Sequence, residues 1–300
     1  MKENFHIISD GSCDLPDEYV AENNVTVVPF YVAFNDGVYF KEKQGMTVRE
    51  FYQKMVDEPK NFPKSSMPSV QDYVDAFMPY VEEDMPIICI CITSKFSGSE
   101  QAARIARQMI HEDRPDAKIE VIDARINTVL QGLYTVEAVR LRDEGVPYEE
   151  AVQRLLDVRS TGRIFFTIGS MDYLRINGRI GKVASIATSR LGIRPVITLR
   201  DGEIFPSGIG RVRKKTVAKS LDLLVNYIKE VKATPKDYEL VIGYGYDIEE
   251  AKEWRREIVI RLAEIGYSIH EAAIRMWQIG AAISVHTGPY ALGVAILKHA

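Results

Sequence analysis

Hydroxyl side chains beside a predicted helix start are the groups in this sequence best suited to hold an anion. The segment 93–99 (TSKFSGS) follows the apolar run 87–92, so it reads as a junction between a buried strand and a helix. In open parallel sheets, ligands bind beyond the carboxyl ends of strands, where a helix N-terminus attracts negative charge. Ser97 could donate a hydrogen bond there, and Gly98 would let a ligand approach the backbone. The alternative is that Ser97 only caps the helix, with Glu100 returning the bond.

Two further segments carry hydroxyl and imidazole groups that a cleft could use. Ser65 belongs to the loop 64–69 (KSSMPS), which an ordinary turn before a capped helix would also explain. His286 is predicted at the end of a strand over 282–285 and is followed by Thr-Gly-Pro. Histidine is well suited to donate to an anion near neutral pH. A purely structural role for this single histidine stays open.

Basic residues gather in two parts of a chain whose net charge is -4. They are Arg175, Arg179, Lys182, Arg190 and Arg194, followed by Arg211, Arg213, Lys214 and Lys215. A solvated helix start is the ordinary explanation for the second group. Basic side chains nevertheless oppose the dipole at a helix N-terminus, which suggests contact with a phosphate or an acidic partner. The negative net charge does not favour nucleic acid as a ligand.

The elements that must position these groups follow an α/β pattern that divides into two domains. Strands and helices alternate over 1–161, which predicts a mostly parallel, three-layer α/β/α domain. Residues 162–300 predict a mixed α+β domain, with a type I′ hairpin at Asp201-Gly202. With 46% hydrophobic residues in 300, the chain can bury a sizeable core and still line a pocket.

Several classes of site are disfavoured by what the sequence lacks. It contains no phosphate-binding loop, dinucleotide fingerprint, hydrolase elbow or metal-ligand spacing. Cys13, Cys89 and Cys91 are predicted to be free thiols in a reducing compartment. No apolar run approaches the roughly 20 residues that span a bilayer, and the first residues do not resemble a signal peptide. We therefore expect a cytoplasmic protein without a bound metal or membrane span.

Six short segments, in order along nearly the whole chain, carry a family resemblance. They are 10–16 (DGSCDLP), 65–69 (SSMPS), 93–99 (TSKFSGS), 121–125 (VIDAR), 177–180 (NGRI) and 286–289 (HTGP). Each segment alone is a weak signal, but their order makes the set strong. Together they resemble the DegV family, the fatty-acid-binding subunits of bacterial fatty acid kinase.

The resemblance implies one long-chain fatty acid, such as palmitate, with its tail buried between the two domains. It also implies that Ser65 and Ser97 hold the carboxylate, with His286 nearby. The binding subunit would present this carboxylate to a separate ATP-dependent kinase subunit, with no cofactor and no catalysis of its own. Arg179 and Arg211 would contact the phosphate or the kinase. Transient contact with a membrane surface is compatible with this role.

Departures from the family pattern concern mainly the acyl tail. Met67 replaces a glutamine, which removes any amide contact, and the bulky stretch 126–130 replaces small residues. These changes predict a reshaped or shortened tail pocket. Two alternatives remain: a hydrolase using Ser97 and His286 as nucleophile and base, or a regulatory module that responds to bound lipid. Ester turnover would favour the first, and partner binding that depends on a filled pocket would favour the second.

Overall fold

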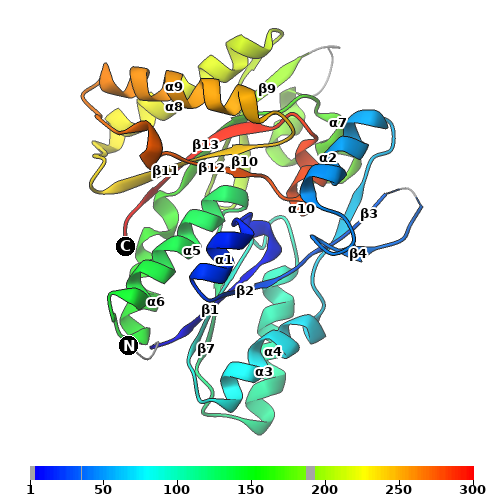
Figure 1. The fold of residues 1–300 in the computed structure, drawn as a ribbon, viewed down its shortest axis with the longest axis vertical. Helices are drawn as coiled ribbons and strands as arrows, with labels where there is room; N and C mark the ends of the chain where they lie inside the picture. The colour runs from blue at the N-terminus through cyan, green and yellow to red at the C-terminus, as the bar shows by residue number, and fades with distance from the viewer. Residues whose placement is uncertain (1–3, 35, 187–192) are drawn as a thin grey trace.

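The computed structural model describes residues 4–34, 36–186 and 193–300. Arg190 of the first basic group therefore lies outside the described residues. Two large sheets, A and C, dominate the fold, with a small third sheet, B, beside them (Figure 1). Within the described ranges, no helix is both long and apolar enough to cross a bilayer.

Sheet A is parallel throughout and has the strand order β2-β1-β6-β7. Its strands are β1 (His6–Asp10), β2 (Val25–Val28), β6 (Ile87–Cys91) and β7 (Ile119–Asp123). The central strands β1 and β6 are buried at every position, as expected for a sheet covered on both faces. Apolar runs such as 87–92 therefore predicted these strands correctly.

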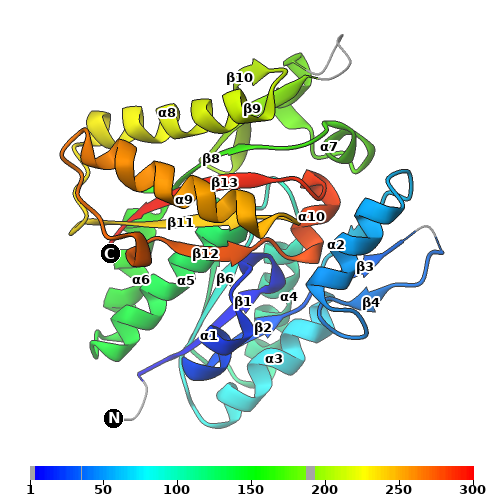
Figure 2. The same ribbon diagram turned by 45° about the horizontal axis from the view of Figure 1, so that its top comes forward.

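Helices cover both faces of sheet A, which confirms the predicted three-layer arrangement (Figure 2). One face packs against α3 (Val70–Glu82) and α4 (Ser99–Asp113). The elements of the opposite layer are α1 (Asp17–Glu22), α5 (Thr128–Asp143) and α6 (Tyr148–Val158). Helix α5 also contacts strands of sheet C, so it lies between the two sheets. This shared helix holds the two halves of the molecule together.

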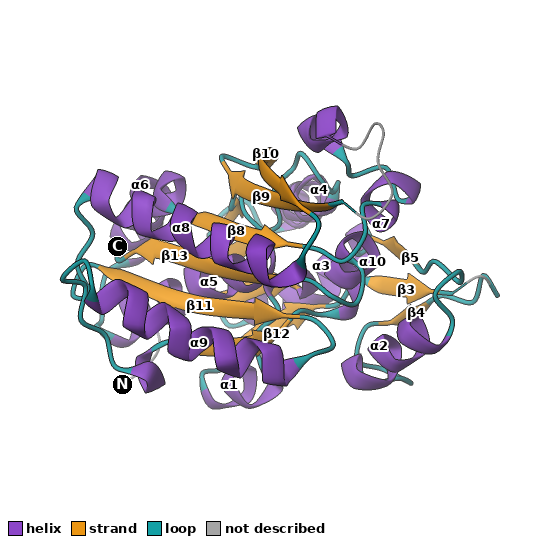
Figure 3. Ribbon diagram, turned by 90° about the horizontal axis from the view of Figure 1, so that it is seen from above, coloured by secondary structure: helices purple, strands orange, loops and turns teal. Residues whose placement is uncertain are grey.

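Sheet C is mixed and has the strand order β10-β9-β8-β13-β11-β12. Its strands are β8 (Arg163–Thr167), β9 (Arg194–Arg200), β10 (Glu203–Gly210), β11 (Tyr238–Tyr244), β12 (Arg275–Gln278) and β13 (Leu292–Lys298). The outer face packs on α8 (Arg213–Val231) and α9 (Ile248–Ala263), seen from above in Figure 3. The hairpin is confirmed, because Asp201 and Gly202 have φ angles of 50° and 84°, as a type I′ turn requires.

Sheet B carries Ser65 on one of its edge strands. It consists of β4 (Phe40–Lys41), β3 (Tyr31–Ala33) and β5 (Lys64–Ser66), and it lies beside α2 (Val48–Asp57). The apolar residues of 25–34 predict a single strand, but this prediction is wrong, because the segment divides into β2 of sheet A and β3 of sheet B. Pro29, which has no backbone N–H for a ladder, lies at the division.

The remaining elements are short. They are α7 (Asp172–Ile176), α10 (Ala281–Thr287), η1 (Gly11–Cys13), η2 (Arg159–Thr161), η3 (Gly181–Ile186) and η4 (Glu271–Ala273). The strand expected over 282–285 is wrong, because this segment forms α10. The sequence pattern of 268–274 also predicts a strand, and this prediction is wrong too, since β12 begins only at Arg275. A domain boundary at 161/162 falls between the strands of sheet A and those of sheet C, and stays a prediction.

Candidate functional site

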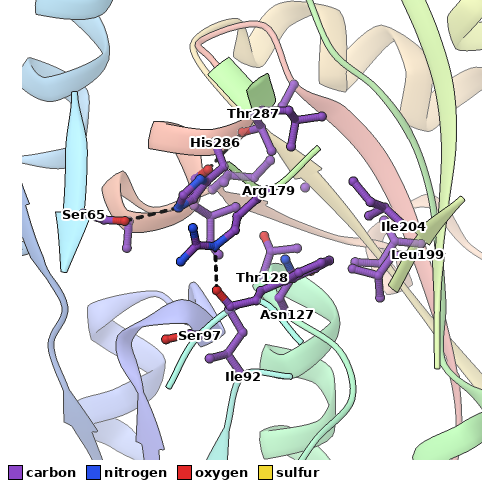
Figure 4. A pocket seen from close by; sticks show the side chains of 18 of the residues that line it. Ser65, Ile92, Ser97, Asn127, Thr128, Arg179, Leu199, Ile204, His286 and Thr287 are labelled. Atoms are coloured by element: carbon purple, nitrogen blue, oxygen red, sulfur yellow. Dashed lines mark hydrogen bonds between the residues drawn. The ribbon is translucent and has the colours of Figure 1, made fainter. Parts of the chain in front are cut away.

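A cavity of about 300 Å³ lies between the inner face of sheet C and the loops at the end of sheet A. Most of its wall is apolar, with Ile164, Phe166, Leu199 and Ile204 from sheet C and Ile92 and Val129 from the N-terminal half. Polar groups gather at the other end, away from Leu199 and Ile204, as Figure 4 shows. The polar residues there include Ser65, Ser97, Arg179 and His286, together with the backbone of Gly98, and the cavity is also lined by Ser66, Asn127, Thr128 and Thr287. This division suits a ligand with one polar end and a long apolar part.

Ser97 lies in the turn that joins β6 to α4. Its hydroxyl oxygen accepts a hydrogen bond from the backbone N–H of Ser99 at 3.2 Å, but the predicted helix cap is wrong, because Gly98 is the N-cap residue of α4 and Ser97 precedes it. The return bond expected from Glu100 is wrong, since that carboxylate pairs with Arg104. Because the oxygen accepts this bond, the Ser97 hydroxyl hydrogen stays available to donate into the cavity. The local contact and a ligand contact are therefore compatible.

Ser65 and His286 meet across the cavity mouth, although 221 residues separate them in the chain. The Ser65 hydroxyl and His286 Nε2 lie 3.2 Å apart (Figure 4). His286 comes from the end of α10, not from the strand end that the sequence suggested. Its Nδ1 is buried and has no hydrogen-bond partner among the described residues. The imidazole is thus positioned by one contact and keeps one nitrogen unused.

The two arginines singled out in the sequence lie in different places. Arg179 lines the cavity, and its Nε donates to the backbone oxygen of Phe96 at 2.8 Å. This bond joins the segment after α7 to the loop that carries Ser97. Arg211 is exposed and does not line the cavity, while its carbonyl accepts a bond from Arg194 at 2.8 Å. The structure therefore groups Arg179, but not Arg211, with the polar end of the cavity.

The family assignment follows from the extent of the match. The family model described as "Uncharacterised protein, DegV family" matches residues 4–299. The chain belongs to the DegV family. Among curated relatives, a DegV domain-containing protein of Caldanaerobacter subterraneus is 30% identical over 97% of this chain and 98% of its own. One from Deinococcus radiodurans is 27% identical over 97% of each chain.

Solved structures of similar proteins share the two-sheet arrangement of this DegV chain. The structure of a stearic-acid-binding protein from Eubacterium ventriosum is 41% identical, covers 98% of each chain and has a TM-score of 0.90. A DegV family protein from Thermus thermophilus is 24% identical, with a TM-score of 0.85 over 98% of this chain and 99% of its own. The second likeness supports the fold only, at this level of identity.

Other residues of the DegV chain at the cavity were not singled out as ligand contacts from sequence. Thr128 lines the wall in a left-handed conformation, with φ of 50°, which is costly for a β-branched residue. Met67 also lines the cavity, and its sulfur lies 2.8 Å from where a Cβ on Gly98 would be. Met67 thus lies directly over the glycine at the start of α4. Neither conformation nor packing of this kind leaves a local sequence signal.

The electrostatics of the site favour a neutral imidazole. Burial, together with the positive charge of Arg179, lowers the pKa of His286 to about 4. The positive end of the α4 dipole lies at the same end of the cavity and favours an anion. Among the described residues, no group of three or more His, Cys, Asp or Glu side chains could hold a metal ion. The polar end can therefore offer a carboxylate the neutral donors Ser65, Ser97 and His286 beside the positive charge of Arg179.

The lowered pKa of His286 predicts a specific dependence of stability on pH. In the unfolded chain this imidazole takes up a proton near pH 6.5, whereas in the folded protein it does so only near pH 4. The neutral His286 therefore contributes to the free energy of unfolding above pH 6.5. This contribution, up to about 3 kcal/mol, is lost as the pH falls to 4. We expect His286→Gln to flatten the decline in urea unfolding measured from pH 7 to 4. Parallel curves for both proteins would contradict this assignment.

Proposed function

We propose that this protein binds one long-chain fatty acid in the cavity, with its carboxylate at Ser65, Ser97, Gly98 and His286. The observation that carries the proposal is the meeting of these polar groups at one end of a mostly apolar cavity. The stearic-acid-binding relative, at 41% identity, supports the same class of ligand. The acyl tail would extend along sheet C toward Leu199 and Ile204.

The physical chemistry of a buried carboxylate supports this choice of residues. An ionised carboxylate in an apolar site must be hydrogen-bonded, and hydroxyl and imidazole groups can donate to it. Each buried methylene of the tail contributes roughly 0.8 kcal/mol, which offsets the entropy lost on binding. Because Ser65 and Ser97 are neutral, one carboxylate oxygen can remain free of a tight ion pair. That oxygen is then available for chemistry by another protein.

Native mass spectrometry, before and after denaturation, tests the proposal directly. The purified protein is loaded with stearic acid, exchanged into volatile buffer and measured intact. We expect a complex of one fatty acid per chain, and release of the free acid after denaturation. A chain that carries no fatty acid even after loading would contradict the proposed function.

The finer part of the proposal is that the bound carboxylate is presented to a separate ATP-dependent kinase subunit. The subunit described here would not be the catalyst, and an acyl phosphate would form at the exposed carboxylate oxygen. Arg179, at the cavity mouth, would contact the transferred phosphate. Arg211, which is exposed, would contact the kinase. A cytoplasmic location belongs to the same proposal, because Cys13, Cys89 and Cys91 are free thiols.

Arg211→Ala should separate lipid binding from kinase coupling. Because Arg211 does not line the cavity, we expect the Kd for stearic acid to stay within about 2-fold of the parent value. Acyl-phosphate formation with the kinase subunit and ATP should fall by roughly 10-fold, since a charged contact is lost. Arg256→Ala, which removes an exposed arginine of α9, is the matched control. Loss of lipid binding in Arg211→Ala would instead assign this arginine to the lipid site.

A serine hydrolase is the rival function, and one observation speaks for it. The nucleophile expected from the sequence is Ser97, but it is the Ser65 hydroxyl that lies 3.2 Å from His286 Nε2, a contact that resembles a nucleophile beside its base. An orienting acid would bind His286 Nδ1, but that atom has no hydrogen-bond partner in the described part of the chain. The carrier proposal predicts no hydrolysis of a p-nitrophenyl acyl ester above the buffer rate. Turnover that Ser65→Ala or Ser97→Ala abolishes would favour the hydrolase.

A further inference from the structure

Two buried carboxyl groups lie against the first turn of α10, far from the cavity mouth in sequence. Asp14 is 6% exposed and Glu42 is 5% exposed. Oxygen Oε1 of Glu42 accepts a hydrogen bond from the backbone N–H of Ala282 at 3.0 Å. A Cβ added to Gly280 would lie 2.5 Å from an Asp14 oxygen and 2.6 Å from the same Glu42 oxygen. Both carboxyl groups therefore surround the residue at which the helix begins.

Asp14 also contacts the opposite wall of the cavity. Its second oxygen accepts a hydrogen bond from the Thr128 hydroxyl at 2.5 Å. Thr128 lines the cavity and keeps its unfavourable left-handed conformation beside this carboxylate. The other oxygen, Oδ1, lies beside Gly280 and has no hydrogen-bond partner among the described residues, so Asp14 fills the space between the start of α5 and the start of α10. Neither Asp14 nor Glu42 lines the cavity itself, so neither touches a ligand there.

The geometry points to a role for this pair: we propose that Asp14 and Glu42 are positioning residues, which fix the start of α10 and thereby place His286 against Ser65. Helix α10 spans Ala281–Thr287, so His286 lies less than two turns from the carboxyl groups. A helix this short moves as a unit. A displacement of 1 Å at its start would break the 3.2 Å contact of His286 with Ser65.

The protonation of the pair is consistent with this role. Burial raises the pKa of Glu42 to about 7. Burial, with the nearby Glu42 charge, raises the pKa of Asp14 well above its ordinary value. A raised pKa favours the neutral form of a carboxyl group, which limits repulsion between two carboxyl groups in one buried place. Asp14 accepts from the Thr128 hydroxyl, and Glu42 accepts from the Ala282 N–H of α10.

The test compares two ligands that differ only at the head group, stearic acid and stearyl alcohol. The inference rests on the proposed function, so the parent protein must first prefer the acid over the alcohol. A parent protein that binds neither, or both equally, would contradict the proposed function. If the parent protein prefers the acid, variants of Glu42 and Gly280 test whether the two carboxyl groups position His286. The measured quantity is the ratio of the two Kd values, because general damage to the fold would weaken both ligands together.

Glu42→Leu removes the acceptor at similar volume, and Glu42→Gln keeps an oxygen as the matched control. We expect Glu42→Leu to lower the preference for acid over alcohol by roughly 10-fold, with alcohol binding changed by less than about 3-fold. Glu42→Gln should stay near the parent ratio. The ¹⁵N signals of the His286 imidazole should shift in Glu42→Leu and not in Glu42→Gln. In a His286→Ala background, Glu42→Leu should cause no further loss.

Gly280→Ala is the second variant, and it decides the question if Glu42→Leu does not fold. Its methyl group would meet both carboxyl groups, so it should displace α10 and lower the same ratio. An unchanged ratio in the folded variants would overturn the inference, with the proposed function intact. Equal losses of acid and alcohol binding would overturn it too, because they would show damage to the whole cavity.

Discussion

The double variant Ser65→Ala/Ser97→Ala is expected to bind stearic acid at least 100-fold more weakly than the parent protein. Each hydrogen bond to a charged group contributes about 1.5–3 kcal/mol, and every 1.4 kcal/mol is a factor of ten in Kd. Both hydroxyl groups lie at the polar end of the cavity, so the carboxylate would lose two donors at once. Isothermal titration calorimetry or displacement of a fluorescent fatty acid would measure the change.

Ser94→Ala provides the matched control for these substitutions. Ser94 belongs to the same 93–99 segment, but its hydroxyl donates to Asp123 at 2.7 Å and does not line the cavity. Its loss should leave the Kd for stearic acid within about 2-fold. The difference in Kd between the parent protein and the double variant should be far smaller for stearyl alcohol than for stearic acid. Unchanged acid binding in the double variant would mean that both serines only stabilise local structure.

The second large effect should appear in a series of fatty acids of increasing length. Every methylene buried against the apolar wall contributes roughly 0.8 kcal/mol, which is about 4-fold in Kd. From ten carbons to the longest chain that fits, affinity should therefore rise steeply and then reach a plateau. The plateau reports the length of the cavity. A Kd independent of chain length would place the tail outside it.

Gly243→Ala should move this plateau to shorter chains. Gly243 and Gly293 are directly paired on β11 and β13, and both line the cavity. A Cβ at Gly243 would lie 3.0 Å from Val129 and 3.4 Å from Ile279. The added methyl group would therefore narrow the cavity beside these two side chains. Short acids should bind as they do to the parent protein. If long acids lose no affinity, the tail does not pass this point.

The sequence predicted most of the architecture because its local patterns agree with the tertiary environment. Continuous apolar runs predict strands covered on both faces, and Asp201-Gly202 predicts a turn that only positive φ angles allow. The failure at 282–285 has a physical cause. β-Branched residues there favour a strand, but the Glu42 carboxylate, 240 residues away, accepts a bond from the first turn of a helix. Tertiary contacts of this range have no local pattern.

The candidate site was less accessible to sequence reasoning than the fold. Local pattern alone favoured a helix cap at Ser97 and an ordinary turn at Ser65, and the family resemblance was needed to group them with His286. The structure adds contacts that the spacing of residues in the sequence does not reveal, such as the 3.2 Å contact between Ser65 and His286. Asp14 and Glu42 were not singled out, because their contacts, the Thr128 hydroxyl and the Ala282 N–H, lie more than 100 residues away in the chain. Their importance depends on burial, which a single acidic residue in a sequence does not indicate.

The strand order of sheet C has a consequence for biosynthesis. Strand β13 (Leu292–Lys298) lies between β8 and β11, so these two earlier strands share a neighbour that the ribosome makes after both. Sheet A, whose strands end at Asp123, can form while translation continues. Sheet C cannot close until β13 leaves the exit tunnel. Helix α10, with His286, emerges just before β13, so the proposed lipid site can be completed only after β8 and β11 have both been made.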